Sequence, residues 1–203
     1  KKDLATTTIV LSGAGAAGTA IARLLVLAGA KNIIGFDSSG VINKKSTANN
    51  EMRKWFVEHC NPGQFEGTLS QALKGADVFI GVSAPNIVSE ADVESMAKDS
   101  IVFALANPDP EIDPVLARKH AAVVATGRSD QPNQINNVLA FPGIFRGLLD
   151  AGASKITDAL LVACADAIAS CVSESQLNAS FIVPSVFDPN VVKAVADAVK
   201  RCC

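Results

Sequence analysis

A glycine-rich segment near the N-terminus has the spacing of a phosphate-binding turn. Residues 13–18 read Gly-Ala-Gly-Ala-Ala-Gly; they follow the apolar run Thr8–Ser12 and lead into a helical pattern from Ala17 to Ala28. A glycine-rich strand–helix turn without a ligand is the alternative interpretation. Because the strand before and the helix after are both present, we favour a turn that binds the diphosphate of a dinucleotide.

Each glycine of this turn has a different expected role. Gly13 permits the tight bend, Gly15 lets a diphosphate approach the backbone, and Gly18 lets the helix pack closely on the strand. The first helical N–H groups, including those of Ala16 and Ala17, carry partial positive charge and have no partner within the helix. We therefore expect these five residues to form a cofactor-binding loop.

An acidic residue follows at the distance that a dinucleotide-binding turn requires. Asp37 ends the next apolar run, Asn32–Asp37, close to the roughly 20 residues expected after Gly18. Its carboxylate would accept hydrogen bonds from the adenosine ribose and repel a 2′-phosphate, which favours NAD over NADP. Lys44 and Lys45 lie nearby and leave NADP possible, although we interpret them as solvated loop residues.

Polar turns follow the later apolar runs. Val82 ends the run Asp77–Val82, and Ser83 follows it directly. Asn107 follows the run Ile101–Leu105, and further amide side chains occur at Asn136 and Asn137. The carboxyl ends of parallel strands share one edge of a sheet, so we expect these turns to meet there. Amide side chains donate and accept hydrogen bonds without charge, which suits a ligand with hydroxyl and carboxylate groups. Ordinary turn formation is the alternative for any single asparagine.

The alternation of short apolar runs with helical patterns predicts an α/β fold. Near-continuous apolar strands are typical of a Rossmann-like, doubly wound, mostly parallel sheet with helices on both faces. We expect residues 1–150 to form this dinucleotide-binding domain. Residues 151–203 predict a C-terminal helical extension, with helices capped at Thr157 and Asp188.

Composition narrows the possible partners. The net charge of −2 provides no electrostatic basis for binding nucleic acid or an anionic membrane surface. No apolar stretch approaches the roughly 18 residues of a membrane span. The five cysteines form neither a Cys-x-x-Cys pair nor a cluster with histidines, so we expect no metal site or disulfide framework and a cytoplasmic setting.

Three segments together resemble malic enzymes, in particular the shorter bacterial type. They are Phe103–Pro108 (Phe-Ala-Leu-Ala-Asn-Pro), Ala125–Asp130 (Ala-Thr-Gly-Arg-Ser-Asp) and Asn136–Gly143 (Asn-Asn-Val-Leu-Ala-Phe-Pro-Gly). Their order behind the glycine turn, and the strand Ile80–Ser83, also resemble that family's cofactor domain. The resemblance covers essentially the whole chain, including the helical tail.

The resemblance implies a set of roles. Gly15, Ala16, Ala17 and Gly18 would contact the pyrophosphate, and Asp37 the adenosine ribose. Val82 and Ser83 would lie near the nicotinamide ribose, while Asn107, with Asn136 or Asn137, would touch malate and the nicotinamide. The family oxidises malate with NAD or NADP and decarboxylates the product with Mg²⁺ or Mn²⁺. The complete enzyme would be a homo-oligomer, a dimer.

The general acid, general base and metal ligands of that chemistry are not apparent in this chain. In the family a tyrosine, a lysine and a carboxylate cluster fill these roles upstream of the present segment, and this chain has no tyrosine. We assign no metal to Asp109, Glu111 and Asp113, because a turn and a helix cap account for the two aspartates. We expect a cofactor-binding half, cut from a longer protein, that binds NAD without turning over malate. Another dehydrogenase on this fold and a non-catalytic nucleotide-binding module are the alternatives.

Overall fold

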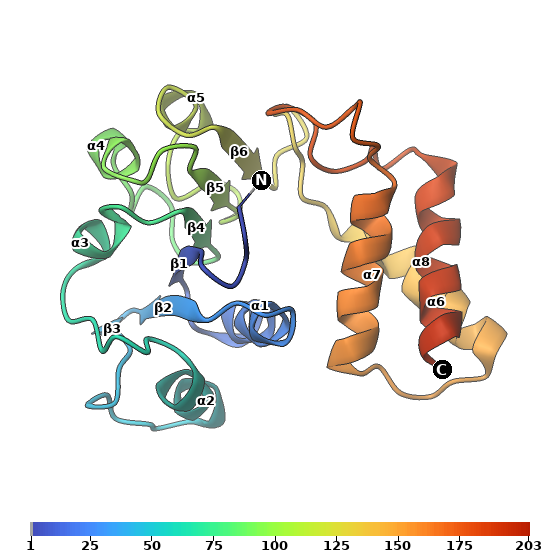
Figure 1. Ribbon diagram of the computed structural model, residues 1–203, viewed down its shortest axis with the longest axis horizontal. Helices are drawn as coiled ribbons and strands as arrows, with labels where there is room; N and C mark the ends of the chain where they lie inside the picture. Colours follow the sequence, from blue (N-terminus) through green and yellow to red (C-terminus); the bar gives the residue numbers. More distant parts are fainter. Residues whose placement is uncertain (1) are drawn as a thin grey trace. The chain divides into compact units, whose positions relative to one another are not determined.

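The computed structural model describes residues 2–203 and divides the chain into two compact units. The first unit extends to Gln131, and the second comprises Pro132–Cys203. Each unit has its own hydrophobic core and is described by itself (Figure 1).

The first unit is built on a six-stranded sheet with the order β3-β2-β1-β4-β5-β6. All neighbouring strands are parallel except β3, which pairs antiparallel with β2. This order reverses direction between β1 and β4, as in dinucleotide-binding folds. The strands are β1 (Thr8–Ser12), β2 (Asn32–Asp37), β3 (Gly40–Val41), β4 (Val78–Gly81), β5 (Ile101–Ala104) and β6 (Val123–Thr126).

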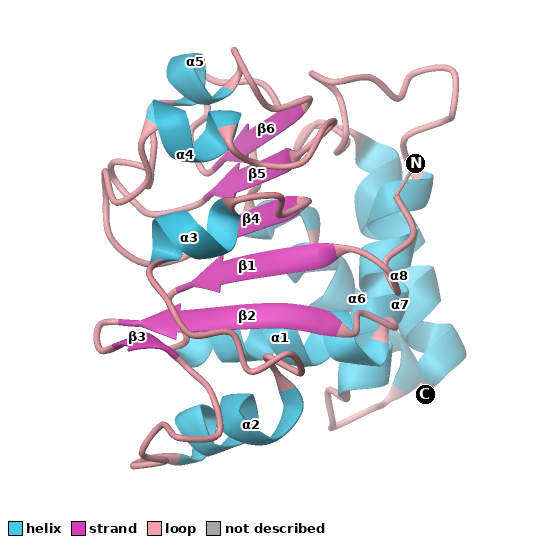
Figure 2. Cartoon of the chain, turned by 60° about the vertical axis from the view of Figure 1, so that its left-hand side comes forward, coloured by secondary structure: helices cyan, strands magenta, loops and turns pink. Residues whose placement is uncertain are grey.

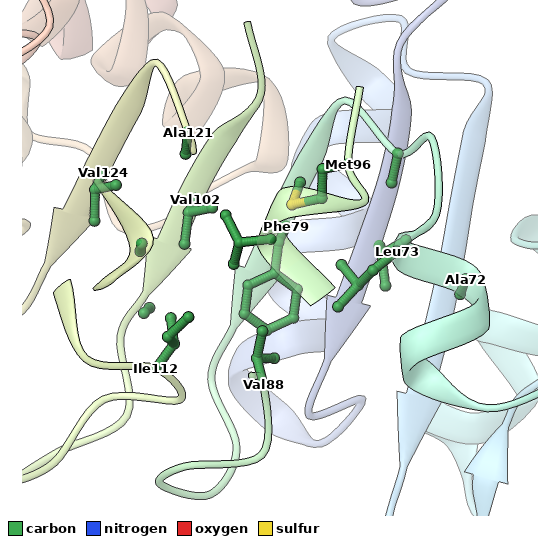
Figure 3. Packing of buried hydrophobic residues seen from close by; sticks show 14 of the residues in the cluster. Ala72, Leu73, Phe79, Val88, Met96, Val102, Ile112, Ala121 and Val124 are labelled. Carbon is green, nitrogen blue, oxygen red and sulfur yellow. The ribbon is translucent and has the colours of Figure 1, made fainter. Parts of the chain in front are cut away.

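Helices cover both faces of this sheet, so alternate residues of each strand enter different cores. On one face, strand residues such as Phe79 and Val102 (Figure 3) pack with α3 (Leu69–Leu73), α4 (Glu90–Glu94) and α5 (Pro114–Ala117). On the opposite face, strand residues pack with α1 (Ala16–Leu27) and α2 (Glu51–His59) (Figure 2). Burial of successive residues explains why the strands are continuous apolar runs.

Most helices begin at a side-chain cap. The hydroxyls or carboxylates of Thr68, Ser89 and Asp113, and the amide oxygen of Asn50, each accept a hydrogen bond from the first turn that follows. Such caps satisfy backbone N–H groups that have no partner within the helix. Among the helices α1 to α5 of the first unit, α1 is the exception, since no side chain caps it.

The second unit contains a short 3-10 helix, η1 (Asn137–Leu139), and three helices, α6 (Phe141–Ala151), α7 (Asp158–Ser170) and α8 (Pro189–Cys202). Its core includes Leu148, Leu160 and Val195. Gly143 and Gly147 let α6 approach α8 closely. A Cβ atom at these positions would lie 2.5 Å from Val195 Cβ and 2.6 Å from Val199 Cβ, respectively.

The expected fold class, a mostly parallel sheet with helices on both faces, is confirmed. The two compact units divide at 131/132, because α6 shares the core of the second unit with α7 and α8, and the functional domain boundary expected at 150/151 stays a prediction. Pro142 occupies the first turn of α6, where its missing N–H costs nothing. The helix α2 begins at Glu51, with Asn50 as its cap.

None of the helices that the structure describes within residues 2–203 is long and apolar enough to cross a membrane.

Candidate functional site

The turn between β1 and α1 has a backbone geometry that requires glycine at position 13. Gly13 has φ +104°, a conformation that residues with a Cβ atom rarely adopt. A Cβ atom there would also lie 2.5 Å from the carbonyl oxygen of Val82. The backbone N–H groups of Gly13 and Ala14 both donate to the carbonyl oxygen of Phe36, each at 2.9 Å, which ties the turn to the end of β2.

Gly18 and Gly15 are needed for opposite reasons. Gly18 is buried, and a Cβ atom there would lie 2.1 Å from the carbonyl oxygen of Gly13, so α1 can pack on the turn only without a side chain. Gly15 is exposed, and a Cβ atom there would meet nothing within 4 Å. Close packing accounts for Gly18, whereas the open space at Gly15, at the N-terminus of α1, leaves room for a ligand to approach the backbone.

The N-terminus of α1 offers backbone donors to that open space. Gly15 is the N-cap, makes no side-chain cap hydrogen bond, and is followed by no acidic residue in the first turn. Ala16 and Ala17 are exposed, and N–H groups at the start of a helix have no partner within it. Together with the partial positive charge of the helix end, these donors fit the diphosphate of a dinucleotide.

The turn after β4 lies against this loop. Ser12, at the end of β1, and Ser83 have their Oγ atoms 2.9 Å apart. Val82 is partly buried and Ser83 is exposed. The two turns therefore meet where the strand order reverses, the position at which open α/β sheets bind their ligands.

Asp37 lies at the end of β2, as the sequence predicted, but it has a partner that the sequence did not reveal. Its Oδ1 accepts a hydrogen bond of 2.8 Å from the Ser39 N–H, and its Oδ2 forms an ion pair with Arg53 Nη1 of α2. The two side chains are only 21% and 14% exposed, respectively. The cation offsets part of the repulsion that Asp37 would exert on a 2′-phosphate.

Glu111 is the residue that sequence reasoning missed. Its side chain is completely buried, and its carboxylate accepts hydrogen bonds from the Ser83 N–H (2.8 Å) and the Ala106 N–H (3.0 Å). Asn107, the expected substrate ligand, follows Ala106 directly and is exposed. The only sequence signal for the burial of Glu111 is that it stands between two apolar residues, Pro110 and Ile112. Both of these are also buried in the structure.

Two other acidic residues, Asp113 and Asp130, have ordinary structural roles. Asp113 caps α5 by accepting from the Val115 N–H at 2.7 Å, as expected. After β6, Arg128 donates twice to Asp130, at 2.9 and 2.6 Å, and this hydrogen bonding lowers the pKa of Asp130 to about 2. Among residues 2–203, the structure shows no group of three or more His, Cys, Asp or Glu side chains that could hold a metal ion.

Asn136 and Asn137 lie in the second unit. Asn136 caps η1 by accepting from the Val138 N–H at 3.0 Å, and Asn137 is exposed. Because Asn107 belongs to the first unit, joint contact of these residues with one ligand stays a prediction.

The strand order and the glycine turn at its reversal point define a dinucleotide-binding domain of the Rossmann type. A family model described as the malic enzyme NAD-binding domain matches residues 1–203. The chain belongs to this family.

Relatives and solved structures agree with this assignment. The chain is 52% identical to an NAD-dependent malic enzyme of Geobacillus stearothermophilus, covering 98% of this chain and 41% of that protein. It is 42% identical to an NADP-dependent malic enzyme of Rhizobium meliloti, covering 98% of this chain and 28% of the relative. The crystal structure of an NAD-dependent malic enzyme from Thermotoga maritima superposes with a TM-score of 0.91 at 42% identity, over 98% of this chain and 52% of that one. The chain thus spans about half or less of these proteins.

Proposed function

We propose that this chain is the NAD-binding part of an enzyme that oxidises malate and decarboxylates the product to pyruvate. The observation that carries the proposal is the open space at Gly15, in front of a helix N-terminus that no side chain caps. This arrangement supplies backbone donors for a diphosphate and leaves room for it. Family membership supports malate as the substrate.

In this proposal the residues of the first unit divide the cofactor between them. The loop Gly13–Gly18 holds the pyrophosphate, Asp37 accepts from the adenosine ribose, and Val82 and Ser83 border the nicotinamide ribose. Asn107 orients malate beside the nicotinamide, with Asn136 or Asn137 as a further ligand. A nicotinamide held beside Val82, Ser83 and Asn107 would supply the acceptor for the hydride on the carbon that carries the malate hydroxyl.

The remaining chemistry requires groups that this chain does not offer. Removal of the hydroxyl proton and protonation of the decarboxylated product need a base and an acid, and the chain has no tyrosine. Within the part of the chain that the structure describes, no group of His, Cys, Asp or Glu side chains fits a divalent metal. We therefore propose that a further part of the polypeptide, packed on the second unit, supplies these groups. A homodimer and a cytoplasmic location belong to the same proposal.

The substitution Gly15→Ala tests the cofactor site, because it adds one methyl group to the open space and nothing else. We expect an unchanged thermal unfolding midpoint and NAD binding weakened by about tenfold or more in isothermal titration calorimetry. Gly63→Ala is the matched control, since its added methyl group also meets nothing within 4 Å. Equal NAD affinity in Gly15→Ala and the unaltered chain would exclude this loop as the pyrophosphate site.

Turnover is measured on the same 203-residue chain with NAD, malate and Mn²⁺. We expect cofactor binding without formation of NADH or pyruvate. Metal-dependent release of pyruvate by this chain alone would contradict the division of roles proposed above.

A further inference from the structure

Glu111 is a buried carboxylate to which the proposed reaction assigns no role. It is 0% exposed, so neither malate nor a cofactor can reach it as it lies in this structure. A buried carboxylate is retained only where hydrogen bonds compensate for the loss of water. The groups that donate hydrogen bonds to Glu111 therefore indicate its role.

Those donors come from two different turns at the carboxyl edge of the sheet. Oε1 accepts from the Ser83 N–H at 2.8 Å and lies 3.3 Å from Ser83 Oγ, while Oε2 accepts from the Ala106 N–H at 3.0 Å. Ser83 Oγ in turn lies 2.9 Å from Ser12 Oγ. The side chain of Glu111 thus links the turns that follow β4 and β5, and through Ser83 it reaches the end of β1.

The end of β4 is shaped to admit this side chain. A Cβ atom on Gly81 would lie 2.3 Å from the carboxyl carbon of Glu111 and 2.6 Å from its Oε1. Any other residue at position 81 would displace the carboxylate. The backbone carbonyl of Glu111 also accepts from the Val88 N–H at 3.0 Å, which fixes the main chain behind the side chain.

We infer that Glu111 is a positioning residue that sets the distance and orientation between Ser83 and Asn107. This inference rests on the proposed function, in which Ser83 borders the nicotinamide ribose and Asn107 the nicotinamide and malate. Glu111 acts through the two backbone amides that it holds and touches no ligand itself. Its main effect is on the nicotinamide half of the cofactor, because it holds the turns after β4 and β5 directly and reaches the pyrophosphate loop only indirectly, through Ser83 and Ser12.

The test compares NAD with ADP, which lacks the nicotinamide half, in calorimetric titrations of the 203-residue chain. Glu111→Gln keeps the size of the side chain but replaces one acceptor oxygen by an NH₂ group that faces a backbone N–H. We expect NAD to bind about tenfold more weakly, while ADP binds within about twofold of the unaltered chain. Glu94→Gln, an exposed glutamate on α4, is the matched control and should change neither affinity.

Equal weakening of NAD and ADP in a folded Glu111→Gln variant would overturn the inference, and so would unchanged binding of both. If Glu111→Gln does not fold, Glu111→Asp replaces it, since this variant keeps both oxygens and shortens their reach. A ratio of NAD to ADP affinity equal to that of the unaltered chain would then also overturn the inference. Failure of the unaltered chain to bind either nucleotide would instead refute the proposed function.

Discussion

At the scale of single residues, the three glycines of the β1–α1 turn each occupy their position for a different physical reason. Gly13 is required by its backbone conformation and Gly18 by close packing, and both needs are met within the chain. Gly15 is the exception, because nothing within the chain requires it. Its place at the uncapped N-terminus of α1, with room for a ligand in front of it, makes Gly15 the functional evidence in this turn.

The ion pair between Asp37 and Arg53 bears on the choice of cofactor. Relatives with similar identity include both NAD- and NADP-dependent enzymes. Arg53 Nη1 pairs with Asp37, and Arg53 Nε is a buried donor without a hydrogen-bond partner among the residues that the structure describes. The cation lowers the electrostatic cost of bringing a 2′-phosphate near Asp37.

We therefore predict that Arg53→Gln increases the preference for NAD. NADP should bind about tenfold more weakly, because the Asp37 carboxylate then repels the phosphate without compensation, while NAD affinity changes little. Competitive titration of the two cofactors measures the ratio. Lys54→Gln, the exposed neighbour on α2, is the control, and NADP affinity that is equal or higher in Arg53→Gln would show the prediction to be wrong.

At the scale of elements, the second unit depends on the contact between α6 and α8. Gly143 and Gly147 are four residues apart, so they lie on one side of α6 and admit Val195 and Val199 of α8. The contact is close enough to involve backbone, since a Cβ atom on Gly147 would lie 2.7 Å from the carbonyl oxygen of Ala196. A backbone atom cannot rotate away as a side chain can.

Two effects oppose each other in Gly147→Ala. Helix propensity would favour alanine over glycine by about 1 kcal/mol in a helix interior. Overpacking of a well-packed contact typically costs about 1–3 kcal/mol, and the backbone oxygen of Ala196 places this site at the upper end. We predict a net loss of about 1–2 kcal/mol in the free energy of unfolding, measured by urea denaturation followed by circular dichroism.

The control for this substitution is Gly63→Ala, where the added methyl group meets nothing within 4 Å. It should leave the free energy of unfolding within about 0.5 kcal/mol of the unaltered value. A Gly147→Ala variant more stable than the unaltered chain would contradict the prediction. It would mean that the helix propensity of alanine outweighs the steric clash, and that α6 and α8 can move apart enough to admit the methyl group.

At the scale of the whole molecule, the two units bury different cysteines and leave two others exposed. Cys60 lies in a core of the first unit and Cys164 in that of the second, whereas Cys202 and Cys203 are exposed at the C-terminus. Burial raises the pKa of Cys60 to about 12 and also raises the pKa of Cys164. The thiolate is the reactive form, so both buried thiols should be inert under mildly alkaline conditions.

Labelling with a thiol-specific reagent followed by peptide mass spectrometry checks this distribution. We predict rapid modification of Cys202 and Cys203, slower reaction of the half-buried Cys171, and no reaction of Cys60 or Cys164 in the folded chain. Because the pKa of Cys60 is raised to about 12, its thiolate is a minor species at mildly alkaline pH, and its labelling should stay far slower than that of Cys202 and Cys203 while the fold persists. In denaturant all five cysteines should react, and early labelling of Cys60 in the native chain would show that its core opens readily.

The sequence alone determined the features that depend on neighbouring residues. The spacing of Gly13, Gly15 and Gly18, the position of Asp37 and the periods of the apolar runs predicted the sheet, its helices and the cofactor loop, because turns and strands are specified locally. Only the tertiary structure decided which distant residues meet. Glu111 contacts Ser83, which is 28 residues away in the sequence, and Arg53 contacts Asp37, which is 16 residues away. Because Glu111 is buried, its carboxylate binds backbone amides in place of water. No local pattern records these pairings, since they depend on how the strands are ordered and on what space a glycine such as Gly81 leaves open.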